Sequence, residues 1–114
     1  MSRPGDLEPG TAWIAEEEVL WVWPDGRQLP GRIAIGVPED LSPRGARCAT
    51  ALDGLHKVIH IQGGSRLQAL VLAIGFVEAR LASFASKGGR VLDPAGEYDA
   101  LTGMFDLIRP DPPE

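Results

Sequence analysis

The chain has 114 residues, of which 44% are hydrophobic and 24% are charged. That length suits one domain with a core of its own, and the composition argues against general disorder. Eleven Lys and Arg against sixteen Asp and Glu leave a net charge of −5. Because this charge repels phosphate backbones and anionic lipid surfaces, we expect no nucleic acid and no membrane as the main partner. A partner that recognises charge is expected to be basic.

The cysteine content and the first residues bear on the compartment. Cys48 is the only cysteine, which rules out an intramolecular disulfide and a thiolate metal cluster, and so favours a reducing, cytoplasmic compartment. Residues 1–11 have no apolar stretch, so no signal peptide is expected there. Two Pro and two Gly in that segment predict a flexible lead.

Two hairpins are predicted in the first half of the chain. Residues 12–23 have the aromatic and β-branched composition of a strand, residues 24–27 form a turn, and residues 32–37 alternate as a second strand. Residues 46–52 and 55–62 flank Asp53-Gly54, which suits a two-residue turn. A tight turn places Cys48 opposite Ile59 and Ala46 opposite Ile61 on the face expected to form the core.

One long helix is predicted between residues 63 and 89. Ser65 can accept a hydrogen bond from the backbone of Gln68, whose side chain can return one to the N–H of Ser65, while Gly88 can end the helix in the left-handed conformation. One apolar stripe at helical spacing is expected to be buried: Leu67, Leu70, Val71, Ile74, Val77, Leu81, Phe84 and Ala85. A second apolar side, which carries Leu72 and Phe76, must then be covered by the C-terminal segment or by another chain.

The last part of the chain is less regular. Residues 90–92 predict a short strand, residues 93–96 a turn, and residues 98–108 a short helix, while the proline-rich residues 109–114 predict a disordered tail. The fold class is therefore α+β. We expect a single domain over residues 12–108, in which a four-stranded antiparallel meander carries one long helix on one face, with a short C-terminal strand or helix.

Large apolar side chains are the main candidates for a protein interface. Trp13, Trp21 and Trp23 flank the run Glu16-Glu17-Glu18 in the first strand, and exposed tryptophans commonly act as interface anchors. The alternative, that they pack within the same chain, stays open. Leu72 and Phe76 are further interface candidates, on the second apolar side of the helix.

The start of the helix is a candidate anion site. Gly64, Ser65 and Arg66 combine free backbone N–H groups, a helix N-terminus and a guanidinium, although they match no P-loop or dinucleotide fingerprint. An ordinary helix start explains the same residues. His56 and His60 are too far apart on a strand to bind one ion. We expect no metal, no cofactor and no catalysis.

The chain also resembles a bacterial family of small domains of unknown function over roughly residues 12 to 92. The resemblance depends on Gly36-Val37-Pro38, on Asp53-Gly54 and on the helix start Leu67-Gln68-Ala69-Leu70 with Leu72 and Ala73 after it. In that family an Asp commonly stands where this chain has Ser65. The resemblance implies a β-meander followed by one long helix, no catalytic residues, and by analogy an immunity-like or accessory role. We therefore expect a protein-interaction domain, as a homodimer or with another protein, with anion or small-molecule binding as the alternative.

Overall fold

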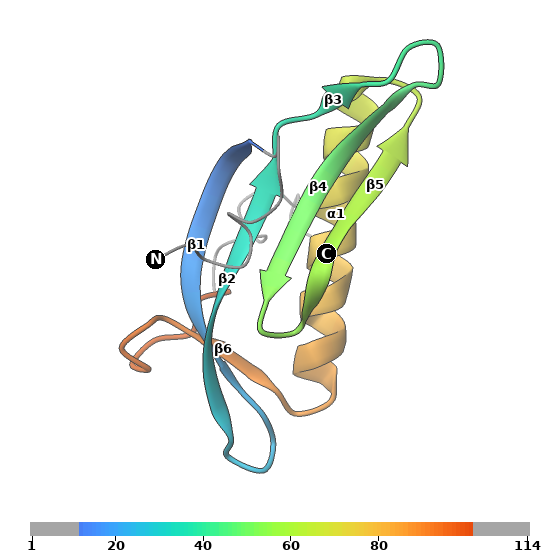
Figure 1. Cartoon of the computed structure of the whole chain (residues 1–114). Helices are drawn as coiled ribbons and strands as arrows, with labels where there is room; N and C mark the ends of the chain where they lie inside the picture. Colours follow the sequence, from blue (N-terminus) through green and yellow to red (C-terminus); the bar gives the residue numbers. More distant parts are fainter. Residues whose placement is uncertain (1–11, 102–114) are drawn as a thin grey trace, which may run out of the picture.

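The strands of the computed structural model, which describes residues 12–101, form one antiparallel sheet with a long helix on one face (Figure 1). The elements, in chain order, are β1 (Trp13–Val22), β2 (Gln28–Gly36), β3 (Glu39–Asp40), β4 (Ala46–Asp53), β5 (His56–Gly63), α1 (Arg66–Ser86) and β6 (Arg90–Leu92). The strand order is β3-β4-β2-β1-β6, and β5 pairs with β4. The predicted α+β class is confirmed.

The number of strands differs from the prediction. β1, β2, β4 and β5 lie side by side as the predicted four strands, but β6 adds to β1 and the short β3 adds to β4, which makes six. The predicted strand over residues 90–92 is β6. Residues 98–101 form no helix, and the remainder of that predicted helix, the flexible lead and the disordered tail lie outside the described residues.

The hairpin between β4 and β5 forms, but its register corrects the prediction by two residues. Cys48 lies opposite Ile61 rather than Ile59, and Ala46 lies opposite Gly63. The reason is an irregularity between Thr50 and Leu52, where β5 contains one residue more than β4. From Ala46 to Thr50 the shift is two residues, so these side chains keep the predicted faces. At Leu52 the shift is one residue, and His56, which was predicted on the face opposite the core, instead contacts Phe76 of α1.

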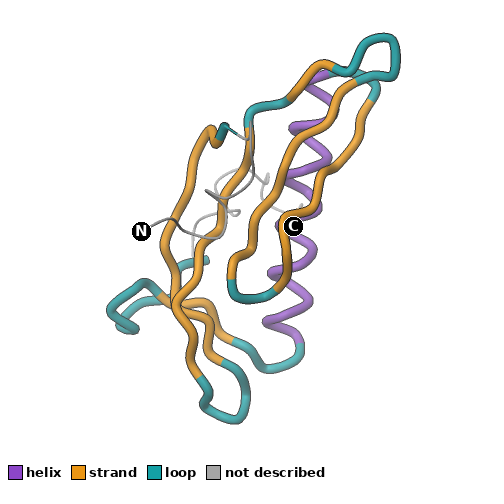
Figure 2. Tube along the Cα trace, in the orientation of Figure 1, coloured by secondary structure: helices purple, strands orange, loops and turns teal. Residues whose placement is uncertain are grey.

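The helix lies behind β4 and β5 in the view of Figure 1, and Figure 2 shows its path along these strands. One core cluster joins Trp21, Leu52, Val77 and Leu81 with other apolar side chains, and a second joins Cys48 and Ala46 to Ala69 and Ala73. A Cβ added to Gly63 would lie 2.6 Å from the backbone nitrogen of Ala69. The N-terminal half of α1 therefore packs closely against the sheet.

The buried stripe of α1 confirms the expectation for Val77 and Leu81 and corrects it for other residues. Ala69, Ala73, Val77 and Leu81 are its buried residues. Leu67 and Val71, which the sequence pattern placed in the buried stripe, are 71% and 59% exposed. Alanines face the sheet because the β4 residues opposite them, Ala46 and Cys48, leave the helix backbone room to approach. This rotation turns Leu67 and Val71 outward.

Candidate protein-interaction surface

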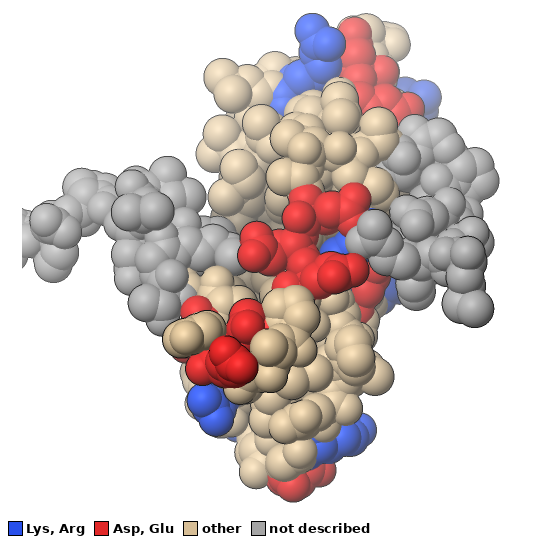
Figure 3. Space-filling view, turned by 90° about the vertical axis from the view of Figure 1, so that its left-hand side faces the viewer, with Lys and Arg blue, Asp and Glu red and all other residues tan. Residues whose placement is uncertain are grey.

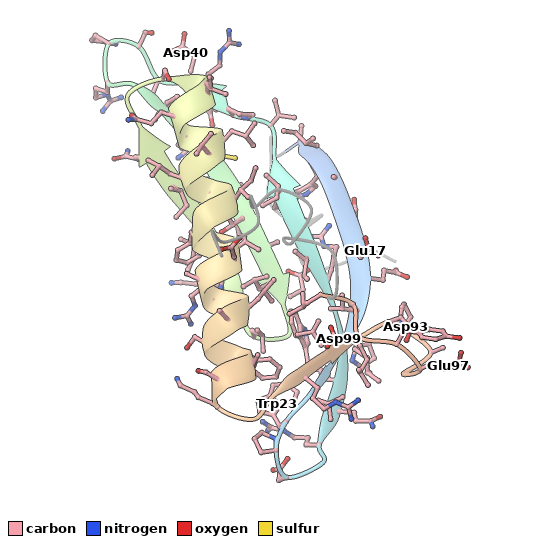
Figure 4. The ribbon with its side chains drawn as sticks, turned by 180° about the vertical axis from the view of Figure 1, so that it is seen from behind. Glu17, Trp23, Asp40, Asp93, Glu97 and Asp99 are labelled. Carbon is pink, nitrogen blue, oxygen red and sulfur yellow. The ribbon has the colours of Figure 1, made fainter. Side chains whose placement is uncertain are left out.

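The side of α1 that faces away from the sheet is largely apolar, with Gln68 and Glu78 as polar side chains on it. We define the outer face of α1 by six residues that are all exposed: Leu67, Val71, Leu72, Gly75, Ala79 and Ala82. Figure 4 shows this side of the helix turned toward the viewer. A surface helix normally carries charged or polar residues here, so the outer face of α1 is the part of the described structure that most resembles an uncovered contact surface.

The described part of the C-terminal segment does not cover this face. Residues 90–92 pair with β1 as β6, and Ala100 and Leu101 pack against the cluster around Trp21. The sequence analysis expected either the C-terminal segment or another chain to cover the helix. Up to residue 101, the C-terminal segment packs elsewhere. Leu72 remains 46% exposed.

The hydropathy of α1 also meets the general criteria for a membrane span. The helix has 21 residues and an 18-residue window of mean hydropathy 1.6, of which 22% is buried. Core helices of soluble proteins meet the same criteria, and α1 packs one stripe against the sheet through Ala73, Val77 and Leu81. Length and composition alone thus do not separate a protein contact from a lipid contact.

Gly75 stands at the middle of the outer face of α1. A Cβ built on this residue meets no heavy atom within 4 Å, and its φ is not in the left-handed region. The fold therefore requires neither the small size nor the conformational freedom of glycine at this position. Within a helix, glycine lowers stability by about 1 kcal/mol relative to alanine, so the fold of the single chain does not explain why glycine stands at this position.

The candidates Leu72 and Phe76 lie on the flank of α1 that borders β5. The ring of Phe76 stands 6.2 Å from that of His56 in β5. Among the described residues β5 pairs only with β4, so its other edge is open and lies next to this flank. Apolar surface thus continues from the outer face of α1 toward a strand edge, where additional strands can pair.

The three tryptophans do not form one patch. Trp21 is 0% exposed, and its indole N–H donates to the backbone oxygen of Asp53 at 2.6 Å, so it belongs to the core and not to the surface. Trp23 is half-buried against Phe84, with ring centroids 5.7 Å apart. Trp13 lies on the sheet face opposite α1. The packing alternative therefore holds for Trp21.

Two close approaches explain why Trp21 can be buried. A Cβ on Gly31 would lie 2.0 Å from the indole nitrogen, and one on Gly54 would lie 2.5 Å from it. Both glycines leave room for the ring. This requirement joins residues distant in sequence, and no local pattern signals it.

The predicted anion site at the helix start serves as a cap. The backbone N–H of Gln68 donates to the hydroxyl of Ser65 at 3.1 Å, and the Gln68 side chain accepts from the N–H of Gly64. The reciprocal bond thus reaches Gly64 and not Ser65, which corrects that detail. With these two N–H groups already bonded, the candidate anion site of Gly64, Ser65 and the exposed Arg66 has fewer free donors, and anion binding there stays a prediction.

A buried charge cluster on the other face of the sheet was missed by the sequence reasoning. Arg32 is 2% exposed, and donates to Asp53 at 2.9 Å and to Glu16 at 3.1 Å. Burial lowers the pKa of Arg32, but the hydrogen bond to Glu16 and the charge of Asp53 outweigh it, so the pKa is raised overall. The Trp13 ring lies 4.9 Å from the guanidinium carbon.

A hollow of about 390 Å³ adjoins this cluster. Its lining residues are Glu18, Leu29, Pro30, Gly31, Arg32, Asp53 and Gly54. The Nη2 atom of Arg32 has no hydrogen-bond partner among the described residues. The hollow is the size of a small-molecule site, and the only sequence signal for it was a charged Arg within an otherwise apolar strand.

Acidic side chains gather on the β1 side of the molecule (Figure 3). Figure 4 places Glu17 on β1 and Asp93, Glu97 and Asp99 in the segment after β6. Asp93 accepts from the backbone N–H groups of Tyr98 and Glu97, both at 2.7 Å, which holds its pKa below the ordinary value. This acidic cluster thus lies on another side of the described structure than the outer face of α1.

Comparisons with known proteins add no relative: no family model, curated protein or solved structure matches the chain. The resemblance to a bacterial family of small domains therefore stays a prediction.

Proposed function

We propose that this chain is a protein-interaction domain that acts through the outer face of α1, and that its first partner is a second copy of the chain. The observation that carries the proposal is the exposure of Leu67, Val71 and Leu72 on one side of a helix. Exposed apolar surface of this kind marks contact sites. An accessory role, such as the immunity-like role expected from the resemblance, fits a domain that acts by contact.

Two facts support an apolar contact over a charged one. Between residues 67 and 82 the only ionisable side chains are Glu78 and Arg80, so the helix offers little for a charged partner to recognise. An acidic cluster with Glu17, Asp93, Glu97 and Asp99 lies on the β1 side. A basic partner would meet that side and leave the outer face of α1 uncovered.

The experiment compares two matched substitutions. Val71 is 59% exposed on the outer face of α1, and Val37 is 50% exposed outside it. Val71→Lys should weaken self-association at least tenfold in sedimentation equilibrium, whereas Val37→Lys should leave it unchanged. Neither variant should lose more than about 0.5 kcal/mol of stability, because both side chains are solvent-exposed. Equal effects of the two substitutions, or none, would contradict the proposal.

The hollow beside Arg32 favours a second candidate function, the binding of a small molecule. The hollow is lined by two carboxylates, of Glu18 and Asp53, and by one guanidinium, of Arg32. A neutral or cationic ligand with a hydrogen-bond acceptor for Nη2 of Arg32 therefore fits better than an anion. A thermal-shift screen with small amides, amines, phosphates and nucleotides tests this candidate and also the site at Gly64, Ser65 and Arg66. A flat response would remove both.

A further inference from the structure

We propose that the hollow beside Arg32 binds a neutral carboxamide or lactam group, whose carbonyl oxygen accepts from Nη2 of Arg32 and whose N–H donates to the carboxylate of Asp53. This inference rests on the second candidate function, the binding of a small molecule, and names the chemical class of the ligand. It follows from the place of the hollow in the sheet, from the atoms that the ion pair of Arg32 and Asp53 leaves unbonded, and from the charges around them.

The hollow lies where the sheet becomes narrower. β4 ends at Asp53, which pairs with Arg32, whereas β2 starts at Gln28 and pairs with β1 along its length (Figure 1). The first residues of β2 therefore extend past the end of β4. Three of them line the hollow together with Gly54 of the following turn: Leu29, Pro30 and Gly31. The volume of about 390 Å³ is within the range of about 300–1,000 Å³ that small-molecule sites have.

Trp21 fixes one wall of the hollow from the core. Its indole N–H donates to the backbone oxygen of Asp53 at 2.6 Å, and its ring stands directly behind Gly31 and Gly54, where a Cβ would collide with it. Because Trp21 is fully buried, the backbone at these two glycines is held in place by the core. The hollow is thus part of the folded chain before any ligand binds, which lowers the entropy lost on binding.

The ion pair of Arg32 and Asp53 leaves one donor and one acceptor unbonded. Nε of Arg32 donates to Oδ2 of Asp53 at 2.9 Å and Nη1 donates to Glu16 at 3.1 Å, while Nη2 is buried and has no hydrogen-bond partner among the described residues. No described residue donates to Oδ1 of Asp53. In a planar guanidinium the N–H of Nε and one N–H of Nη2 point the same way. The unbonded donor is therefore directed to the Asp53 side, where the hollow lies.

The charges around the ion pair select a neutral group. Carboxylates of Glu18 and Asp53 line the hollow with the guanidinium of Arg32, and Glu16 adds a third carboxylate to the cluster, so an anion would meet mostly negative charge. An ammonium ion has donors only; it would leave Nη2 without an acceptor and would face the charge of Arg32. A carboxamide carries an acceptor and a donor side by side without a charge, which matches the two unbonded atoms.

The outer part of the lining suits an apolar body. Arg32, which is 2% exposed, is the most buried residue of the lining, whereas Leu29, Pro30 and Gly54 are exposed. The amide group therefore reaches inward to the ion pair, and the rest of the ligand lies against Leu29 and Pro30. Small-molecule sites commonly combine apolar walls with a few polar groups that fix the orientation of the ligand. An aromatic or aliphatic amide is thus the expected ligand class.

Three compounds that share one ring test this class: benzamide, benzoate and benzylamine. In NMR titrations of the ¹⁵N-labelled full chain, benzamide should shift the amide signals of Gly31 and Gly54 and the indole signal of Trp21, which lies behind them. The indole signal of Trp23, which packs against Phe84, is the internal control and should not move. Benzoate and benzylamine should bind at least tenfold more weakly than benzamide.

A pair of matched variants tests the site. Leu29 is 43% exposed and lines the hollow, and Val37 is 50% exposed outside it. Leu29→Trp places a larger side chain at the hollow and should weaken benzamide binding at least tenfold, whereas Val37→Trp should leave it unchanged. Both substitutions replace exposed side chains and leave the ion pair of Arg32 and Asp53 intact, so both chains should fold.

Each outcome decides a different claim. Binding of benzoate or benzylamine in the hollow as tightly as benzamide would overturn the ligand class and leave small-molecule binding standing. Benzamide binding that Leu29→Trp does not weaken would overturn the site. No shift with any of the three compounds would overturn the inference, and a flat thermal-shift screen in addition would remove the second candidate function as well.

Discussion

Gly75→Ala is expected to raise the stability of the single chain and lower its tendency to associate. The position lies inside α1, and the added methyl group meets no atom within 4 Å. Overpacking therefore does not offset the gain in helix propensity, which is about 1 kcal/mol. For a domain of this size, a gain of that magnitude raises the melting temperature by about 4 °C.

The two effects separate by protein concentration. Urea unfolding at low micromolar concentration reports the single chain, where the midpoint should rise without a change in slope. Sedimentation equilibrium at high concentration reports the proposed dimer, in which the added methyl group lies at the contact and holds the two copies apart. Its dissociation constant should increase. The wild-type chain under the same conditions is the reference for both measurements.

Either half of this result can refute the reasoning. A Gly75→Ala chain that is less stable at low concentration would show that the site is crowded, against the open space around the residue. A chain that gains stability but associates as before would place the contact away from Gly75. The first result concerns the helix, and the second concerns the interface.

Three further predictions concern the fold. Trp21→Phe should lower the free energy of unfolding by about 1–3 kcal/mol, because the Asp53 carbonyl loses its indole donor. Trp23→Phe should lower it less in the same urea titration, because the Trp23 indole makes no hydrogen bond among the described contacts. Burial raises the pKa of the Cys48 thiol, so a thiol reagent at neutral pH should modify it only after unfolding; rapid labelling of the native chain would contradict its burial. The backbone N–H groups of Tyr98 and Glu97 hold the pKa of Asp93 below its ordinary value of 3.8, so the stability that Asp93 contributes is complete above pH 3.8 and is lost as the pH falls through the folded pKa. Asp93→Asn should therefore reduce the loss of stability between about pH 4 and lower pH, and an unchanged acid dependence would refute this.

The sequence predicts the local features of this fold well. The turn at Asp53-Gly54, the cap at Ser65 and the helix end at Gly88, whose φ is 92°, depend on residues close in sequence, and all three are present. Their chemistry is decided within a few residues, so periodicity and turn signals are sufficient for them.

Features that depend on distant residues were not predictable in the same way. The burial of Trp21 requires Gly31 and Gly54 to leave room for its ring. The cluster of Arg32 with Glu16 and Asp53 joins three strands, and a strand pattern alone reads Arg32 as a solvent-facing residue. The burial of Trp21 leaves no signal in a short window of sequence, and a charged Arg within an apolar strand does not by itself indicate its partners.

The orientation of α1 illustrates the same limit. Hydrophobic periodicity assigned the largest apolar residues to the core, Leu67 and Val71 among them. The structure instead buries Ala69 and Ala73, because small residues on both elements let the helix approach β4 closely. The residues displaced from the core became the outer face of α1, so the same correction that changed the core supplied the candidate interface.

The mass of the wild-type chain as a function of concentration tests the central claim most directly. If the outer face of α1 binds a second copy, the weight-average mass by light scattering should rise from the 12.2 kDa of one chain toward twice that value as the concentration increases through the micromolar range. A mass that stays at 12.2 kDa up to millimolar concentration would contradict the account.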